Sequence, residues 1–252
     1  MSTPAERFDD RTRRQFIAQG RTEVRPGELL RHRGYTRVVH WSVAAFFILA
    51  LLSGFSIYSP WLYRWLTPLF GGGPMTRVLH PWFSVAFVAL FVLQFALWLR
   101  PMSWTGDDSR WMRRLRSYVT NTEKLEPEYV GFFNAGQKLY FWTIGATAVI
   151  FLVTGIPIWF PATFGRMAVA IGYVLHDIAA LVMLVGFVVH LYEGTASQPG
   201  TFHSMTRGTV SKRWAWTHHP AWYRHVTGRD PRADYERAVQ QRANRAGEED
   251  AS

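Results

Sequence analysis

The sequence predicts an all-α integral membrane protein, in which four helices form a bundle and both ends of the chain are polar. Four long apolar stretches, at 38–58, 78–99, 138–160 and 167–192, alternate with polar segments. A helix of about 20 apolar residues crosses a hydrocarbon core about 30 Å thick, so each stretch can span a membrane. Aromatic residues make up 16% of the chain, and those that lie between the stretches are typical of membrane interfaces.

The polar segments divide the chain into three parts. We interpret residues 1–37 as a basic cytoplasmic extension with little fixed structure, residues 38–192 as the membrane domain, and residues 193–252 as a cytoplasmic tail. Between the second and third stretches, residues 107–118 are expected to form a short surface helix, with Trp104 and Trp111 as membrane anchors.

Lysine and arginine are distributed unevenly between the two sides of the membrane that four spans define. Residues 1–40, 100–138 and 193–252 hold 9, 7 and 9 of them, whereas the other two connectors hold 2 and 1. Cytoplasmic loops carry the excess of positive charge, so this distribution predicts that both termini are cytoplasmic. The formal net charge is +10, and we expect the basic residues to contact membrane lipid and not nucleic acid.

Histidines mark both ends of the last apolar stretch. His176 and His190 are fourteen positions apart, which separates them by roughly 21 Å along a helix and leaves them within about 40° of the same face. His40 begins the first stretch and His80 begins the second. The predicted topology therefore places His40 and His190 near the cytoplasmic face, and His80 and His176 near the outer face.

Two histidines at the same depth can supply both axial ligands of a haem iron, an arrangement that favours electron transfer over oxygen binding. The chain has no cysteine, which excludes cysteine-ligated iron–sulfur clusters and covalent C-x-x-C-H haem attachment. We therefore predict two non-covalent b-type haems, with the inner iron bound by His40 and His190 and the outer iron by His80 and His176. Each ligating ring is expected to donate its second N–H to a carbonyl or hydroxyl oxygen.

A histidine at a helix end is usually only a polar residue near lipid headgroups, and His40 or His80 alone would be interpreted in that way. Polar residues at membrane depth are costly, so four of them in two depth-matched pairs favour ligation. The remaining histidines lie in polar segments and are weaker candidates: His32, His203, His218, His219 and His225. The segment 212–220, KRWAWTHHP, is interpreted as a docking or headgroup-binding segment and not as a metal site.

Over about residues 37–223 the chain resembles the gamma, or cytochrome b, subunit of membrane-bound respiratory formate dehydrogenase. The resemblance is carried by Val39-His40-Trp41, Leu79-His80-Pro81, Asn134-Ala135-Gly136-Gln137-Lys138, Val153-Thr154-Gly155, Leu175-His176, Val189-His190-Leu191-Tyr192, Arg213-Trp214-Ala215, His218-His219-Pro220 and Trp222-Tyr223-Arg224. The run from Asn134 to Lys138 is the most specific, since related hydrogenase and thiosulfate-reductase cytochromes share the four-helix, two-haem plan more loosely.

The resemblance implies the same assignment of histidines to the outer and inner haems. It also implies a quinone site beside the inner haem, formed by Asn134, Gly136 and Gln137, for menaquinone or ubiquinone. The two amides could bond to a quinone carbonyl, and the glycine allows a close approach of the backbone. Asn134 is equally suited to cap the third membrane helix, and both roles can hold together.

The resemblance further implies that the chain works in a complex of the bacterial inner membrane. Its partners would be an iron–sulfur beta subunit and an alpha subunit with a molybdenum or tungsten pterin, and a higher oligomer of this heterotrimer is left open. The chain itself would carry electrons and reduce quinone, without formate chemistry of its own. Alternatives are the cytochrome b of a hydrogenase or thiosulfate reductase and, more distantly, a haem-free membrane anchor or transporter.

Overall fold

The computed structural model describes residues 23–120 and 125–249 of the 252-residue chain. The chain divides into two compact units. The membrane unit comprises Gly34–Leu99 and Tyr140–Leu191, and the polar unit comprises the described parts of Met1–Arg33, Arg100–Leu139 and Tyr192–Ser252.

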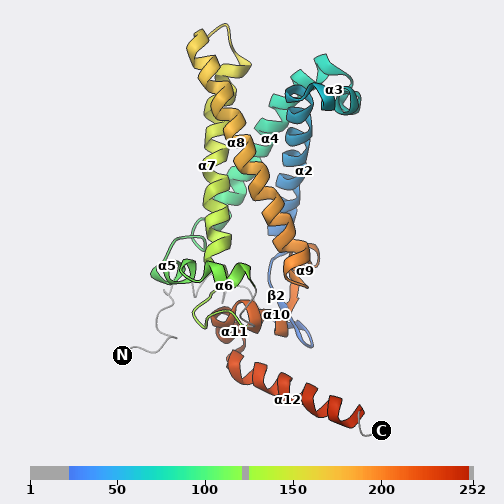
Figure 1. The fold of residues 1–252 in the computed structure, drawn as a ribbon, viewed down its shortest axis with the longest axis vertical. Coiled ribbons are helices and arrows are strands. Elements are labelled where there is room, and N and C mark those ends of the chain that lie inside the picture. Colours follow the sequence, from blue (N-terminus) through green and yellow to red (C-terminus); the bar gives the residue numbers. More distant parts are fainter. Residues whose placement is uncertain (1–22, 121–124, 250–252) are drawn as a thin grey trace. The chain divides into compact units, whose positions relative to one another are not determined.

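Four long helices match the predicted spans (Figure 1). They are α2 (Gly34–Tyr58), α4 (Gly73–Trp98), α7 (Ala135–Trp159) and α8 (Arg166–Tyr192). Each of the four is long and apolar enough to cross a membrane, which confirms the predicted helical membrane protein. The first turns of α7 belong to the polar unit, and α8 continues as a π-helical turn over Glu193–Ser197.

All four helices begin earlier than the sequence pattern predicts, and the difference is largest for α4. α4 begins at Gly73 and not at residue 78, so Pro81 lies inside the helix and not in its first turn. The preceding connector is also helical, with α3 (Pro60–Leu66) and a 3₁₀ turn, η2 (Thr67–Phe70). Gly71 and Gly72 then take φ values of +83° and +94°, a region that side chains disfavour, and reverse the chain into α4.

The interior of the membrane unit is a column of large apolar side chains. Its buried members are Val43, Phe87, Phe91, Ile144, Ala148 and Met183. Next to this column the Phe95 side chain of α4 reaches the backbone of α7 at Gly145, where a Cβ would lie 2.8 Å from Phe95 Cε2. Phe95 consequently stacks on Phe141 with ring centroids 4.5 Å apart. The outward faces of the helices expose apolar side chains, as lipid contact requires.

The polar unit contains a small antiparallel sheet that the sequence pattern did not predict. Its strands are β1 (Glu23–Arg25), β2 (Glu28–Leu30) and β3 (Thr209–Ser211), in the order β1-β2-β3, with Leu29 opposite Val210. Its helices are α5 (Gly106–Met112), α6 (Leu115–Val119), α9 (Thr201–Thr206), α10 (Lys212–His218), α11 (Pro220–Thr227) and α12 (Pro231–Glu249).

A hydrophobic core joins the two ends of the chain within the polar unit. It consists of Leu29, Val210, Trp214, Ala215, Trp222 and Tyr223. The expectation of little fixed structure is therefore wrong for residues 23–37, since Leu29 is completely buried and residues 34–37 begin α2; residues 1–22 lie outside the described residues. The C-terminal segment also folds, because its tryptophans and Tyr223 supply the apolar area that its charged residues lack.

The surface helix expected at 107–118 is present as two short helices, α5 and α6, but one of its proposed anchors is not at the surface. Trp111 is only 2% exposed and its indole N–H donates to Glu126 Oε2 at 2.8 Å. Trp104, by contrast, is exposed. Trp111 is thus a core residue of the polar unit and cannot serve as a membrane anchor.

Candidate functional site

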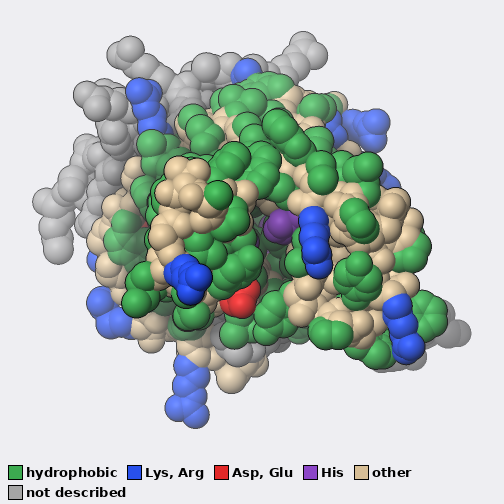
Figure 2. All heavy atoms as spheres, turned by 90° about the horizontal axis from the view of Figure 1, so that it is seen from above, with side chains coloured by type: hydrophobic (Ala, Val, Ile, Leu, Met, Phe, Trp, Pro, Cys, Tyr) green, Lys and Arg blue, Asp and Glu red, His purple; other side chains and the backbone are tan. Residues whose placement is uncertain are grey.

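The four predicted ligand residues all belong to the membrane unit, and the structure brings them together in the predicted pairs. His40 of α2 and His190 of α8 have ring centroids 6.1 Å apart. His80 of α4 and His176 of α8 have ring centroids 6.5 Å apart. Figure 2 shows the end of the membrane unit that carries α3, where a histidine is visible in a hollow among hydrophobic side chains.

These spacings can be compared with the size of a metal centre that has two imidazole ligands. An imidazole nitrogen lies about 2 Å from a bound transition metal. Because the ring centre is about 1 Å farther away, two rings on opposite sides of one metal have centroids roughly 6 Å apart. Both observed pairs have this separation, so the residues present fit two bis-histidine haems. Their assignment as ligands stays a prediction.

Hydrogen bonds fix the ring orientation in the pair of His80 and His176. His80 Nδ1 lies 3.1 Å from Ala50 O and 3.0 Å from Ser53 Oγ. A carbonyl oxygen can only accept, so Nδ1 of His80 carries the proton. His176 Nδ1 similarly lies 2.9 Å from Thr154 Oγ1. With the proton on Nδ1, Nε2 of each ring keeps the lone pair that a metal needs.

The local sequence explains why these hydroxyls accept. Ser53 and Thr154 are buried inside membrane helices, where their hydroxyl protons bond back to carbonyls one turn earlier: Ser53 to Leu49 O at 2.7 Å, and Thr154 to Ile150 O at 2.6 Å. Only the oxygen lone pairs of Ser53 and Thr154 therefore remain, and these can accept a hydrogen bond from an imidazole N–H. Gly54 admits the ring, because a Cβ there would lie 3.1 Å from His80 Cε1.

Aromatic contacts orient the pair of His40 and His190. Tyr140 of α7 stacks on His190 with centroids 4.9 Å apart and planes within 2°, and Trp41 meets His40 edge-on at 5.3 Å. Sequence reasoning missed Tyr140, whose only signal is its position a few residues after the Asn-Ala-Gly-Gln-Lys run.

The proposed quinone residues form the N-terminal cap of α7 and belong to the polar unit. Asn134 Oδ1 accepts from Gln137 N at 2.9 Å, and Gln137 Oε1 accepts from Asn134 N at 3.0 Å. This reciprocal pair is a capping box, so the structure contains the capping arrangement that the sequence left open. Among the described residues, neither side-chain amide nitrogen has a hydrogen-bond partner.

A buried ion pair secures the same helix start. Lys138 Nζ donates to Asp108 Oδ2 at 2.8 Å and to Ser103 O at 3.1 Å. Asp108 also accepts from Thr105 N at 2.7 Å, which caps α5. These bonds connect α5 to the first turn of α7, within which Gly136 lies against Trp111. The segment 134–138 therefore has a fixed place in the polar unit.

The polar unit also contains a buried arginine. Arg31 is 2% exposed, with its guanidinium carbon 3.7 Å from the ring centre of Phe132 and 4.6 Å from that of Trp222. It donates to Phe132 O, and its Nη2 lies 3.4 Å from His219 Nε2. Burial lowers the pKa of Arg31, and the aromatic rings around it partly compensate for the lost water.

Part of the segment 212–220, which was predicted to dock or to bind headgroups, is buried in the polar unit, whereas Arg213 is exposed. Trp214, His219 and Pro220 are buried, and His219 Nδ1 donates to Gly131 O at 2.7 Å. Burial, together with Arg31, places the pKa of His219 well below its ordinary value and that of His218 at about 4. Both rings are therefore neutral at pH 7, and both pack against Trp214 in the core of the polar unit.

The fold and the paired histidines indicate a class of protein: a multi-pass membrane protein whose histidine spacings fit a b-type cytochrome. Residues 31–208 match the family described as prokaryotic cytochrome b561, and the chain belongs to this family. Membership implies that the chain binds haem b.

Curated relatives narrow this class further. The chain is 31% identical over 214 residues to the nitrate-inducible formate dehydrogenase cytochrome b556 subunit of Escherichia coli, covering 84% of this chain and 97% of that protein. It is 33% identical over 201 residues to a second formate dehydrogenase cytochrome b556 subunit of E. coli, with coverages of 79% and 93%. The corresponding subunit of Haemophilus influenzae is 30% identical over 200 residues, with coverages of 78% and 82%. These similarities confirm the resemblance predicted from the motifs.

Proposed function

We propose that the chain is the dihaem cytochrome b subunit of a formate dehydrogenase complex in the bacterial inner membrane. In this proposal, electrons enter from an iron–sulfur subunit at the outer face and leave to quinone at the cytoplasmic face. His80 and His176 hold the outer haem, and His40 and His190 hold the inner haem. The observation that carries the proposal is the pair of imidazole spacings, 6.5 and 6.1 Å.

The residues of the chain have three tasks in this function. A haem iron with two imidazole ligands supplies one-electron exchange and has no open position for oxygen. The helices hold the imidazoles at two depths, since His176 and His190 are fourteen positions apart on α8 and thus roughly 21 Å apart. Ser53, Thr154 and Tyr140 fix the planes of the rings, and the apolar column around Phe87 excludes water.

Asn134 and Gln137 are suited to bind quinone in addition to capping α7. Their carbonyl oxygens are used in the cap, whereas their amide N–H groups can donate to a quinone carbonyl. Gly136 lets the quinone ring approach the backbone. In the proposed orientation, with both termini cytoplasmic as the lysine and arginine distribution favours, quinone reduction takes its protons from the cytoplasm.

The partners proposed for the chain follow from the names of its relatives, which are formate dehydrogenase subunits. We propose an iron–sulfur subunit and a catalytic subunit with a molybdenum or tungsten pterin. The electron donor, formate, distinguishes this complex from a hydrogenase or a thiosulfate reductase. Formate added to native membranes should reduce the b-type absorption band, and reduction by hydrogen but not by formate would contradict the proposal.

Replacement of one outer ligand tests the assignment of the histidines. His80→Ala should remove one of the two haems and leave the other reducible by quinol, because His40 and His190 are unchanged. The measurement is the haem-to-protein ratio and the dithionite-reduced spectrum of the purified complex. His203→Ala, at an exposed position on α9, is the matched control and should keep both haems. Retention of both haems in His80→Ala would contradict the assignment.

A further inference from the structure

The two histidine pairs differ in how their second ring nitrogens are bonded. In the outer pair, His80 Nδ1 has two oxygen partners, at 3.1 and 3.0 Å, and His176 Nδ1 has one at 2.9 Å. In the inner pair, His40 Nδ1 is buried and has no hydrogen-bond partner among residues 23–120 and 125–249. His190 contacts the rings of Tyr140 and His40, and its ring nitrogens have no oxygen partner in the same part of the chain.

This difference changes the electron density that each ring offers to a metal. A histidine that donates its Nδ1–H to an oxygen gains negative character, which makes Nε2 a more basic ligand. A more basic ligand stabilises the oxidised, more positive iron, and hydrogen bonding to axial ligands is one of the levers on haem potential. The acceptors here are strong ones, since the hydroxyl protons of Ser53 and Thr154 are already engaged with helix carbonyls.

We propose that Ser53 and Thr154 are positioning residues that lower the reduction potential of the outer haem below that of the inner haem. Their hydroxyl oxygens, with Ala50 O, polarise His80 and His176, whereas no such acceptor meets the inner ligands in the part of the chain that the structure describes. Electron flow from the outer to the inner haem is then downhill. This order of reduction potentials offsets the work of moving an electron towards the negative, cytoplasmic side of the membrane. The inference rests on the proposed haem assignment.

The test is a potentiometric titration of the b-type absorption band in the purified complex, together with low-temperature electron paramagnetic resonance. Thr154→Val keeps the size of the side chain and removes the acceptor of His176. This variant should raise the lower of the two midpoint reduction potentials and leave the higher one unchanged. Ser53→Ala should raise the same midpoint by less, because His80 still donates to Ala50 O. Thr154→Ser, which retains a hydroxyl, should restore the original midpoint.

The chain offers two matched controls. Thr147 lies two helical turns before Thr154 on α7 and is equally buried at 4% exposure, but its hydroxyl bonds to Thr143 O and Ile144 O and meets Met183 Sδ. Ser56 is fully buried like Ser53, and its hydroxyl bonds to Ser53 O. Thr147→Val and Ser56→Ala should therefore leave both midpoints unchanged.

The outcomes separate this inference from the proposed function. The component that disappears in His80→Ala must be the one with the lower midpoint; loss of the higher one overturns the inference. Unchanged midpoints in both Thr154→Val and Ser53→Ala, with two haems retained, also overturn it and leave the dihaem function standing. A wild-type complex with fewer than two haems would instead refute the proposed function. If Thr154→Val loses a haem, the midpoint potential of the milder variant Ser53→Ala decides between the outcomes: a raised lower midpoint supports the inference, and an unchanged one overturns it.

Discussion

Asn134 shows how one side chain can carry two separable roles. Its oxygen caps α7 by accepting from Gln137 N, while its amide nitrogen is the group proposed to donate to quinone. Aspartate has the same shape and an equally good capping oxygen but no amide donor. The two roles can therefore be tested apart by substitution at this one position.

Asn134→Asp should slow quinone reduction severalfold while haem content and thermal stability stay near those of the wild type. The reason is that the capping oxygen survives and the donor to the quinone carbonyl is lost. The measurement is the rate of quinone reduction with haems pre-reduced, at several quinone concentrations. Asn134→Ser, which also caps without an amide, should behave in the same way; an unchanged rate in both variants would leave Asn134 as a capping residue only.

At this scale the sequence predicts the positions of the histidines but not their surroundings. The depths of His40, His80, His176 and His190 follow from helix rise and the distribution of positive charge, which need no packing information. Thr154 stands in one of the motifs that carry the family resemblance, yet its contact with His176 depends on how α7 and α8 pack. Tyr140 likewise meets His190 only through packing.

Among the elements, α8 is the one that ties the membrane unit together, because it supplies one histidine to each pair. Its two ligands lie fourteen positions apart, close to four full helical turns, which returns them to nearly one face. Residues 23–33 and residues 193–249 show where prediction from the sequence fails. Their pattern is mostly polar, and the core around Leu29 and Trp214 forms only when two distant segments meet.

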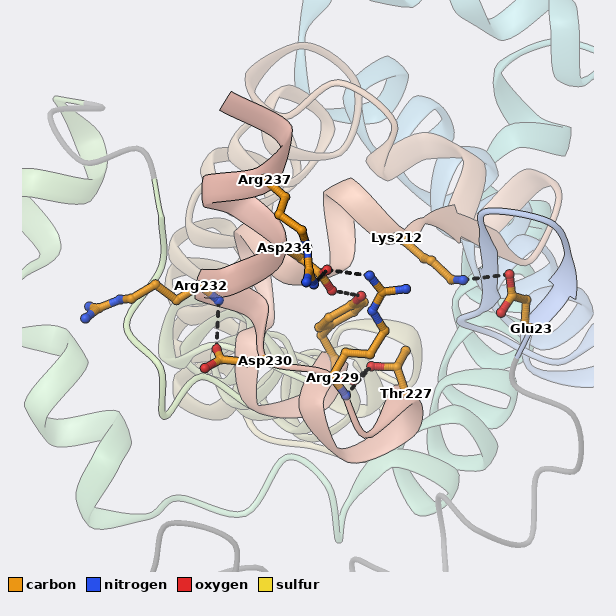
Figure 3. Close-up of polar contacts among 9 residues, drawn as sticks. Glu23, Lys212, Thr227, Arg229, Asp230, Arg232, Asp234 and Arg237 are labelled. Atoms are coloured by element: carbon orange, nitrogen blue, oxygen red, sulfur yellow. Dashed lines mark hydrogen bonds and ion pairs between the residues drawn. The ribbon is translucent and has the colours of Figure 1, made fainter. Parts of the chain in front are cut away.

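The last helix of the polar unit is held by a buried carboxylate (Figure 3). Asp234 of α12 accepts from Tyr223 Oη and from Arg229 Nη2, each at 2.5 Å, and also from Arg237. Burial opposes ionisation, but the bonds from Arg229, Tyr223 and Arg237 prevail and lower the pKa of Asp234 to about 2. Burial and the same carboxylate raise the pKa of Tyr223 to about 12.

Asp234→Asn should lower the free energy of local unfolding of α12 by about 2 kcal/mol, the usual contribution of a hydrogen bond to a charged group. Hydrogen exchange of the α12 amides in the purified complex measures this change. Glu236→Gln, at an exposed position on the same helix, is the control and should have no effect. Slow exchange in Asp234→Asn equal to that of the wild type would show that the carboxylate does not hold the helix.

The pH dependence of this contact has a definite sign. The pKa of Asp234 in the folded protein, about 2, lies below the ordinary value of 3.8. The ionised carboxylate therefore contributes fully to the stability of α12 above about pH 4, and this contribution is lost as the pH falls towards 2. The protection of the α12 amides, which is the intrinsic exchange rate at the same pH divided by their observed rate, should therefore fall between these values in the wild type. The Asp234→Asn variant should show no such fall.

For the whole molecule, the four spans and the family could be predicted from the sequence, because hydropathy and short motifs are local properties. The division into a membrane unit and a polar unit could not be predicted, since the polar unit is assembled from three separate segments. This division places the imidazole pairs in one unit and the Asn134–Gln137 cap in the other. The proposed haem ligands and the proposed quinone-binding residues thus belong to different units of the chain.

The central claim is that α8 holds two haems, each shared with one other helix. A cryo-electron microscopy map of the purified complex tests it most directly. The account predicts density for one haem iron between His80 and His176 and for a second between His40 and His190, each bonded to both rings. Absence of iron from either place, or an iron bound by only one ring of a pair, would contradict it.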